Sequence, residues 1–293
     1  MQPIPAPSTP EIPRDAATVV LLRDGPTGLE TLLLRRHTRM ANMGGVYVFP
    51  GGKLDADDRA AHAVLDQNPH ALHTALAEPA LDAATAAGLH VAALREALEE
   101  CGLLLAEPVT EPGTLDASQA RALLRAGQPF AQVLQALGLR LATQHLVPWS
   151  RWITPLAPAV ATRRFDTRFF IARAPAGQTA LHDNEETTAS LWVAPRAALE
   201  QYRDHRIELA PPQIMSLAQL ARHASVADAL AEARRQRPPT ILPEAYESAG
   251  ARVICYPGDP LHSVPERALP GPTRLCQRAR LFLPEEGFDA LFA

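Results

Sequence analysis

Three glutamates on one face of a predicted helix constrain this chain more than any other feature. The segment His90–Leu103 has the apolar spacing of a helix, and Gly102 suits a left-handed C-terminal cap. Helical geometry places Glu96, Glu99 and Glu100 within an arc of roughly 100° on the polar side. Carboxylates spaced i, i+3 and i+4 repel one another and weaken an isolated helix. We therefore expect a positive charge at this face.

Two kinds of positive partner could neutralise the glutamates. Arg95 lies beside the arc and could orient one carboxylate through a bidentate contact. A hard divalent cation would satisfy the others, because oxygen-only ligands favour Mg²⁺ or Mn²⁺. The alternative is an ordinary solvated charged face, which is common on surface helices. The glutamates alone leave both interpretations open.

An upstream turn favours the metal site. A short predicted strand, Val46–Phe49, is ended by Pro50-Gly51-Gly52, whose glycines let the backbone approach a ligand closely. Gly52 together with the segment Arg95-Glu96-Ala97-Leu98-Glu99-Glu100-Cys101-Gly102-Leu103 resembles the Nudix box, G-x5-E-x7-R-E-U-x-E-E-x-G-U, where U is a bulky aliphatic residue. Ala97 is small for its U position.

The box is split. Arg95 comes 43 positions after Gly52, whereas the family pattern has 14, so the box carries an insertion of 29 residues. Asp58 occupies the spacing of the first Glu, and the insertion leaves its role open. A split box of this kind resembles the Nudix subfamily that contains peroxisomal coenzyme A diphosphatases. Other segments with this resemblance are Leu32–Arg36, Val48–Gly52, Trp152–Pro155, Arg163–Phe170, Asp183–Glu186 and Trp192-Val193. It covers about residues 15–220.

The resemblance implies a metal-dependent Nudix hydrolase that cleaves a diphosphate linkage in a nucleoside diphosphate derivative. It implies Mg²⁺ or Mn²⁺ bound by Glu96, Glu99 and Glu100, with the carbonyl of Gly52 as a backbone ligand. Arg95 would orient the carboxylates. Water would then attack the phosphorus in line while the metal polarises the phosphoryl oxygens.

The general base has two candidate sources. It could be Glu99 within the box, or Glu185 or Glu186 from the acidic loop before Trp192. That acidic pair could equally be an ordinary turn ahead of a strand. The sequence leaves the choice open.

Arginines could hold the substrate phosphates, because guanidinium groups suit bidentate phosphate binding. The candidates are Arg35, Arg36, Arg39, Arg163, Arg164 and Arg168, each of which could also be an ordinary surface charge. The implied substrate is coenzyme A or an acyl-coenzyme A, cleaved to 3′,5′-ADP and 4′-phosphopantetheine or its acyl form.

An upstream signature of many coenzyme A diphosphatases, R-x3-G-x3-FPGG, is only half present. Gly45 is there, but Ala41 stands where arginine is expected. ADP-ribose, a dinucleotide or a nucleotide sugar therefore remains an alternative substrate. A catalytically weak Nudix-fold binding or regulatory module is the alternative of another class.

Composition excludes several other classes. A formal net charge of −4 argues against a general nucleic-acid binder, which needs a basic surface. No stretch approaches the roughly 20 apolar residues of a membrane span. Three cysteines without a C-x-x-C pair favour a reducing, cytoplasmic environment. The expected partner is a small diphosphate molecule.

The rest of the chain predicts an α+β fold. Strand signals occur at 17–22, 30–35, 164–172 and 190–193, and the first two read as a hairpin. Helices are expected at 117–126, 130–137, 197–202, 212–223 and 226–236. We therefore predict a Nudix-type α/β/α sandwich with a mixed β-sheet and helical insertions.

The expected organisation has three parts. They are a flexible Pro-rich arm at 1–13, a Nudix hydrolase domain at 14–237, and a Pro-rich extension at 238–293 packed on the domain or on a partner. Helical insertions are expected at about 56–89 and 113–147. They could form a lid, a substrate wall or the surface of a homodimer.

Overall fold

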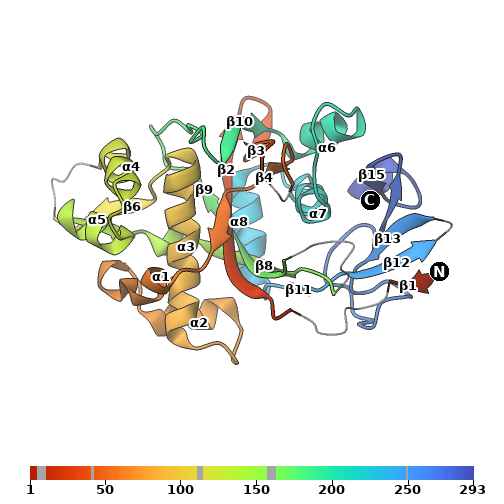
Figure 1. The fold of residues 1–293 in the computed structure, drawn as a ribbon, viewed down its shortest axis with the longest axis horizontal. Coiled ribbons are helices and arrows are strands. Elements are labelled where there is room, and N and C mark those ends of the chain that lie inside the picture. Colours follow the sequence, from red (N-terminus) through yellow and green to blue (C-terminus); the bar gives the residue numbers. More distant parts are fainter. Residues whose placement is uncertain (5–10, 41–42, 111–114, 157–162, 249) are drawn as a thin grey trace.

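A mixed β-sheet runs through the middle of the molecule, with helices on both faces (Figure 1). The computed structural model describes residues 1–4, 11–40, 43–110, 115–156, 163–248 and 250–293. Ala41 lies outside these residues. The predicted α+β sandwich is confirmed.

The central sheet combines parallel and antiparallel pairs. In spatial order its strands are β10 (Thr187–Val193), β3 (Gly28–Arg36), β2 (Arg14–Gly25), β9 (Phe165–Arg173), β8 (Val147–Ile153) and β11 (Thr240–Ile241). The β2–β9 and β8–β11 pairs are parallel, and the others are antiparallel. The predicted hairpin is β2–β3. Short β4 (Tyr47–Val48) pairs with β3, and β5 (Gly51–Lys53) pairs with β2.

The helix with the three glutamates, α3 (Ala83–Cys101), covers one face of the sheet (Figure 1). It begins at Ala83 rather than His90, because the Asp82 side chain caps it by accepting a bond from Thr85 N at 2.8 Å. Its apolar residues pack on those of β2 and β9. Around it lie α1 (Ala56–Ala60), η1 (Ala61–Val64), α2 (Pro69–Leu76), α4 (Ala117–Arg125) and α5 (Phe130–Ala136).

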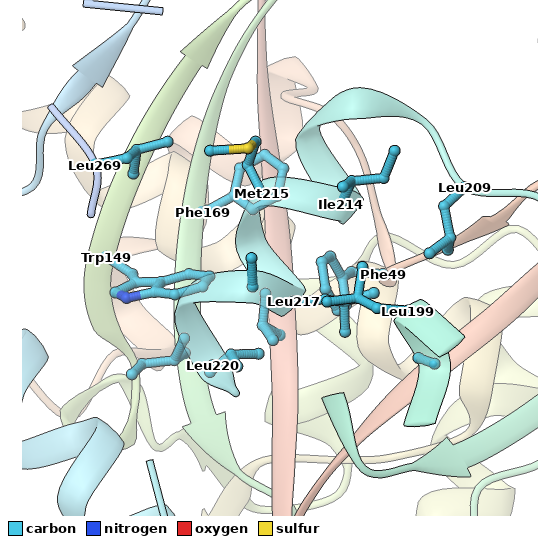
Figure 2. Packing of buried hydrophobic residues seen from close by; sticks show 14 of the residues in the cluster. Phe49, Trp149, Phe169, Leu199, Leu209, Ile214, Met215, Leu217, Leu220 and Leu269 are labelled. Carbon is cyan, nitrogen blue, oxygen red and sulfur yellow. The ribbon is translucent and has the colours of Figure 1, made fainter. Parts of the chain in front are cut away.

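The opposite face is covered by α6 (Pro195–Arg203), α7 (Pro211–Leu220) and α8 (Val226–Arg235). Figure 2 shows Met215 and Leu217 of α7 among the aromatic side chains of this core. Phe49 belongs to the same cluster and packs edge-to-face on Phe169, with ring centroids 6.4 Å apart. Because Phe49 directly precedes Pro50, this packing anchors the Pro-Gly-Gly turn.

A second, antiparallel sheet joins both ends of the chain (Figure 1). It contains β1 (Gln2–Pro3), β12 (Glu244–Ser248), β13 (Ala251–Cys255), β14 (Arg274–Arg278) and β15 (Leu281–Leu283), in that spatial order. Leu275 and Leu281 from this sheet, and Leu291 from η3 (Phe288–Phe292), pack into the core beneath α6 and α7. The C-terminal extension therefore contributes to the main core.

Two smaller features complete the fold. The strands β6 (Ala106–Pro108) and β7 (Leu139–Leu141) pair beside α5, and η2 (Thr143–His145) follows them.

Among the described residues, we find no helix with the length and apolar character that crossing a membrane requires. All three cysteines are buried and free.

Candidate active site

The Pro-Gly-Gly turn lies directly against the box helix α3. Gly51 N donates a hydrogen bond to Glu100 Oε2 at 2.9 Å. A Cβ atom added at Gly52 would overlap the Glu96 carboxylate. Only glycine fits at position 52 with this arrangement. The insertion of 29 residues therefore leaves the two halves of the box together.

Arg95 is the centre of the carboxylate cluster. Its Nε and Nη2 donate to the two oxygens of Asp58 at 2.9 and 3.0 Å. Its Nη1 donates to Glu96 Oε1 at 2.8 Å and to Glu99 Oε2 at 2.9 Å. Burial alone would lower the pKa of Arg95, but the bonds to Asp58 and the nearby carboxylates raise it above its ordinary value. Arg95 therefore stays charged and fixes both glutamates.

Asp58, whose role the sequence leaves open, is a buried partner of Arg95. It lies in α1 and is only 3% exposed. Asp55 N donates to Asp58 Oδ2 at 2.9 Å, which caps the start of α1. Because the insertion lies after Asp58, it does not change the spacing between Gly52 and Asp58. That spacing is the sequence signal that identified Asp58.

Burial disfavours the charged forms of all three box glutamates. Desolvation raises the pKa of Glu96 to about 7 and that of Glu100 well above its ordinary value. Desolvation also raises the pKa of Glu99, although Arg95 opposes the shift. Because Glu100 is only 4% exposed, the interpretation as a solvated charged face is wrong.

The donor chemistry fits a hard divalent cation. Buried carboxylates beside a glycine backbone offer only oxygen ligands, and a cation would offset their mutual repulsion. Within the described residues, no three His, Cys, Asp or Glu side chains already converge as a metal site. Arg95 Nη1 instead lies between one oxygen of Glu96 and one of Glu99. Metal binding would use the other oxygens or turn these side chains.

The acidic loop lies at the C-terminal end of the box helix. Leu181 N donates to Cys101 O at 2.9 Å. Glu185 and Glu186 are exposed. The charge of Glu186 helps to raise the pKa of Glu100, after burial and Glu96, which places Glu186 near the box.

The arginines separate into two groups. Arg35, Arg36 and Arg39 lie in β3 and the turn after it. The charge of Arg36 lowers the pKa of Glu100, so Arg36 lies near the carboxylates. Among the described residues, Arg36 Nε is buried without a hydrogen-bond partner. Its guanidinium therefore has unused capacity beside the box.

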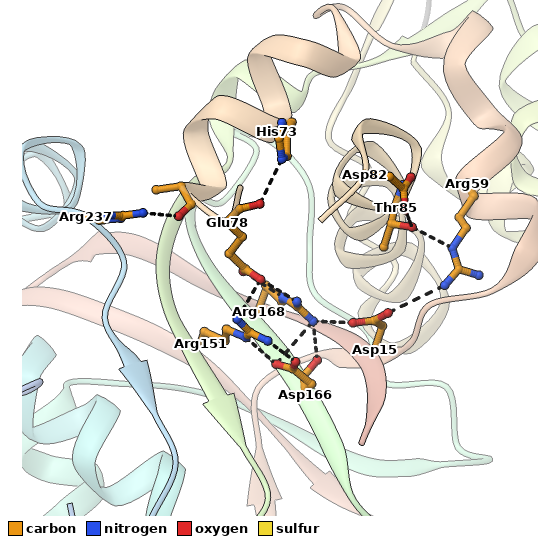
Figure 3. A network of polar contacts seen from close by, with 11 residues as sticks. Asp15, Arg59, His73, Glu78, Asp82, Thr85, Arg151, Asp166, Arg168 and Arg237 are labelled. Carbon is orange, nitrogen blue, oxygen red and sulfur yellow. Dashed lines mark hydrogen bonds and ion pairs between the residues drawn. The ribbon is translucent and has the colours of Figure 1, made fainter. Parts of the chain in front are cut away.

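Two other candidate arginines, Arg164 and Arg168, make internal contacts. Arg164 donates to Thr154 O at 3.0 Å and to Glu11 O at 2.7 Å. Arg168 is 3% exposed and pairs with Glu78, Asp15 and Asp166, of which Asp15 is 30% exposed (Figure 3). These carboxylates and carbonyls occupy the two guanidinium groups. Arg163 is exposed.

The sheet between helices and the glycine turn against the box helix define a Nudix hydrolase. The solved structure of a NUDIX hydrolase from Alicyclobacillus acidocaldarius is similar, with a TM-score of 0.62 and 30% sequence identity. The match covers 75% of this chain and 96% of that one. The family described as the NUDT19 Nudix domain matches residues 13–220, and the chain belongs to this family.

Two curated relatives extend over most of the chain. The acyl-coenzyme A diphosphatase NUDT19 of Gallus gallus is 29% identical over 308 residues, covering 85% of this chain and 79% of the relative. The protein of the same name from Homo sapiens is 30% identical over 278 residues, covering 80% and 72%. The predicted Nudix hydrolase is confirmed.

Proposed function

We propose that this chain hydrolyses coenzyme A or an acyl-coenzyme A at its diphosphate, releasing 3′,5′-ADP and 4′-phosphopantetheine or its acyl form. The observation that carries the proposal is the contact of Gly51 and Gly52 with Glu100 and Glu96. The substrate class is supported by the two relatives named acyl-coenzyme A diphosphatase.

Four oxygen donors would hold Mg²⁺ or Mn²⁺. They are the carboxylates of Glu96, Glu99 and Glu100 and the carbonyl of Gly52. A bound ion would polarise the phosphoryl oxygens and stabilise the leaving phosphate. Arg95, itself fixed by Asp58, would keep the carboxylates in place when the substrate arrives.

A carboxylate near the box would accept the proton of the attacking water. Glu99 is one candidate, because its side chain is 39% exposed and can meet solvent. Glu186 is the loop candidate with more support, because its charge acts on Glu100. Glu185 remains a third candidate from the same loop. Each would need to lie within hydrogen-bond reach of the water in the bound complex.

The arginines of β3 and its turn would bind the substrate phosphates. Arg36 is favoured because its buried Nε has no partner among the described residues and its charge reaches Glu100. Arg35 and Arg39 are exposed nearby along the chain and could contact a more distant phosphate. Guanidinium groups suit this task because they donate two parallel bonds.

A substrate panel tests the proposal. The protein is incubated with Mg²⁺ or Mn²⁺ and with coenzyme A, an acyl-coenzyme A, ADP-ribose, NADH or a nucleotide sugar, and products are identified by mass. We expect 3′,5′-ADP from coenzyme A or its acyl form. Preferred cleavage of ADP-ribose, NADH or the nucleotide sugar would show that coenzyme A is not the substrate class. No turnover on the whole panel would favour a binding module.

The metal assignment makes a separate prediction. Glu99→Gln and Glu100→Gln should each lower kcat by about a hundredfold or more, because each removes a charged metal ligand. Gln preserves the size of the side chain, so thermal unfolding should still be cooperative. Normal rates in both variants would contradict the assignment.

A further inference from the structure

The end of the box helix is held by groups from outside the box. A helix leaves its last four carbonyls without partners within the helix. The Gly102 amide donates to Leu98 O and the Leu103 amide donates to Ala97 O, so neither amide reaches the carbonyls of the last three residues. The carbonyls of Glu99 and Cys101 instead receive donors from the second insertion and from the acidic loop.

The donor to Glu99 is Arg121, in α4 of the second insertion. Its Nε and Nη2 donate to Glu99 O at 3.2 and 2.8 Å. A cation also interacts favourably with the negative end of the helix dipole. Gly102 makes room for this contact, because a Cβ there would lie 3.3 Å from Arg121 Nη1.

The acidic loop docks on the same helix end. Leu181 N bonds to Cys101 O at 2.9 Å, and Thr187 Oγ1 lies 3.5 Å from Glu100 O. Between these two contacts, Asp183 shapes the loop. Its Oδ1 accepts bonds from the amides of residues 185, 186 and 187 at 3.0, 3.1 and 2.8 Å.

The second insertion also contacts this loop. Arg125, one turn after Arg121 in α4, donates through Nη2 to Asp183 O at 3.3 Å. Adjacent turns of one helix therefore hold the end of the box helix and the loop that carries Glu185 and Glu186. This arrangement fixes the loop relative to Glu99.

We propose that Arg121 is a positioning residue for diphosphate hydrolysis, holding the end of the box helix and, together with Arg125, the loop 181–187 in register with it. The proposal rests on the proposed function. It gives the second insertion a part in catalysis, although its residues carry no catalytic motif. Because a displacement of about 1 Å can cost about a hundredfold in rate, loss of this contact should slow turnover.

The test compares three variants on the substrate that the panel identifies. Arg121→Met removes the donors, Arg121→Lys keeps one charged donor, and Arg140→Met removes a half-exposed arginine of the same insertion as a control. We expect Arg121→Met to lower kcat by about ten- to a hundredfold with KM within about twofold. Arg121→Lys should recover part of the loss, and Arg140→Met should match the unmodified protein. Unchanged kcat in Arg121→Met would overturn the proposal.

Hydrogen exchange supplies a readout that does not depend on turnover. In Arg121→Met, a peptide covering residues 178–190 should exchange faster, while one covering 17–22 in β2 should be unchanged. Equally faster exchange in both peptides would show general destabilisation and would overturn the positioning role. If the unmodified protein hydrolysed nothing, the proposed function would fail, and exchange would still decide whether Arg121 docks the loop.

Discussion

At the scale of single residues, the lack of a Cβ atom at Gly52 allows the glycine turn to lie against the box helix. The Glu96 carboxylate occupies the space that a Cβ at position 52 would need. This explains how the turn and the box helix approach so closely. A larger residue there would displace the Glu96 carboxylate.

Gly52→Ala should therefore lower turnover by at least about a hundredfold, because a shift of about 1 Å is enough for that loss. The overlap is with the end of the flexible Glu96 side chain, so turning that carboxylate relieves it, and the cost in unfolding free energy should be about 1 kcal/mol or less. Steady-state kinetics and denaturant unfolding measure the two effects. Lys53→Ala, which changes the exposed neighbouring side chain, is the control. Wild-type kinetics in Gly52→Ala would mean that Glu96 does not need this turn.

His90 gives the box helix a dependence on pH that is separate from the carboxylates. Its ring is fully buried against Phe170, with centroids 4.6 Å apart, and Nδ1 lies 2.9 Å from Ala86 O. Burial lowers the pKa of His90 from 6.5 to about 4. The unfolded chain therefore takes up a proton first as the pH falls.

Stability should consequently decrease as the pH falls from about 6.5 to about 4, by about 3 kcal/mol from this residue. In the His90→Leu variant, which has no titratable group at this position, the unfolding free energy should depend less steeply on pH in this range. Denaturant unfolding at a series of pH values between 4 and 7 measures it. An identical slope in both proteins would show that His90 does not titrate in this way.

The residues that the sequence identified are those related by local spacing. Helical periodicity placed Glu96, Glu99 and Glu100 on one face, and the distance from Gly52 marked Asp58. Arg121 carried no such signal, because its contact with Glu99 joins two elements through the tertiary fold. The sequence also does not show that the guanidinium group of Arg168 is paired with carboxylates, because these come from other elements.

At the scale of elements, α1 and α3 form a unit through the Asp58–Arg95 pair. Asp58→Asn should cost about 2–3 kcal/mol of unfolding free energy, because it removes charge-assisted bonds from a buried arginine. It should also lower kcat, since Arg95 would no longer hold Glu96 and Glu99 as firmly. Asp57→Asn, at the exposed neighbour, is the control. Equal stability of the two variants would contradict the pairing.

Elements with regular patterns were predictable, and irregular ones were not. The hairpin and α4 follow the sequence signals closely. The strand β8 was missed, because Pro148 and a register shift between Pro148 and Ser150 interrupt its alternation. The short strands of the second sheet were missed as well, since they lie among prolines and their partners are distant in sequence.

At the scale of the whole molecule, the C-terminal extension is part of the main core. Leu275 of β14 is fully buried in the cluster that contains Phe49 and Trp149. Leu275→Ala should lower the unfolding free energy by about 2–5 kcal/mol. The thermal transition should remain single and shift to lower temperature for both near-UV and far-UV circular dichroism. Separate transitions would show that the extension unfolds on its own.

Both halves of the box are anchored to the same strand, β2: the glycine turn through β5, and the glutamates through α3. The inserted chain between Asp58 and Arg95 therefore starts and ends at positions that the fold already fixes. Doubling its length would add only about 0.6 kcal/mol to the entropic cost of closing the loop. A longer connection at this point would therefore leave the two halves of the box in contact. A search that demands constant spacing would overlook such enzymes, whereas one that lets the interval between Asp58 and Arg95 vary would recover them.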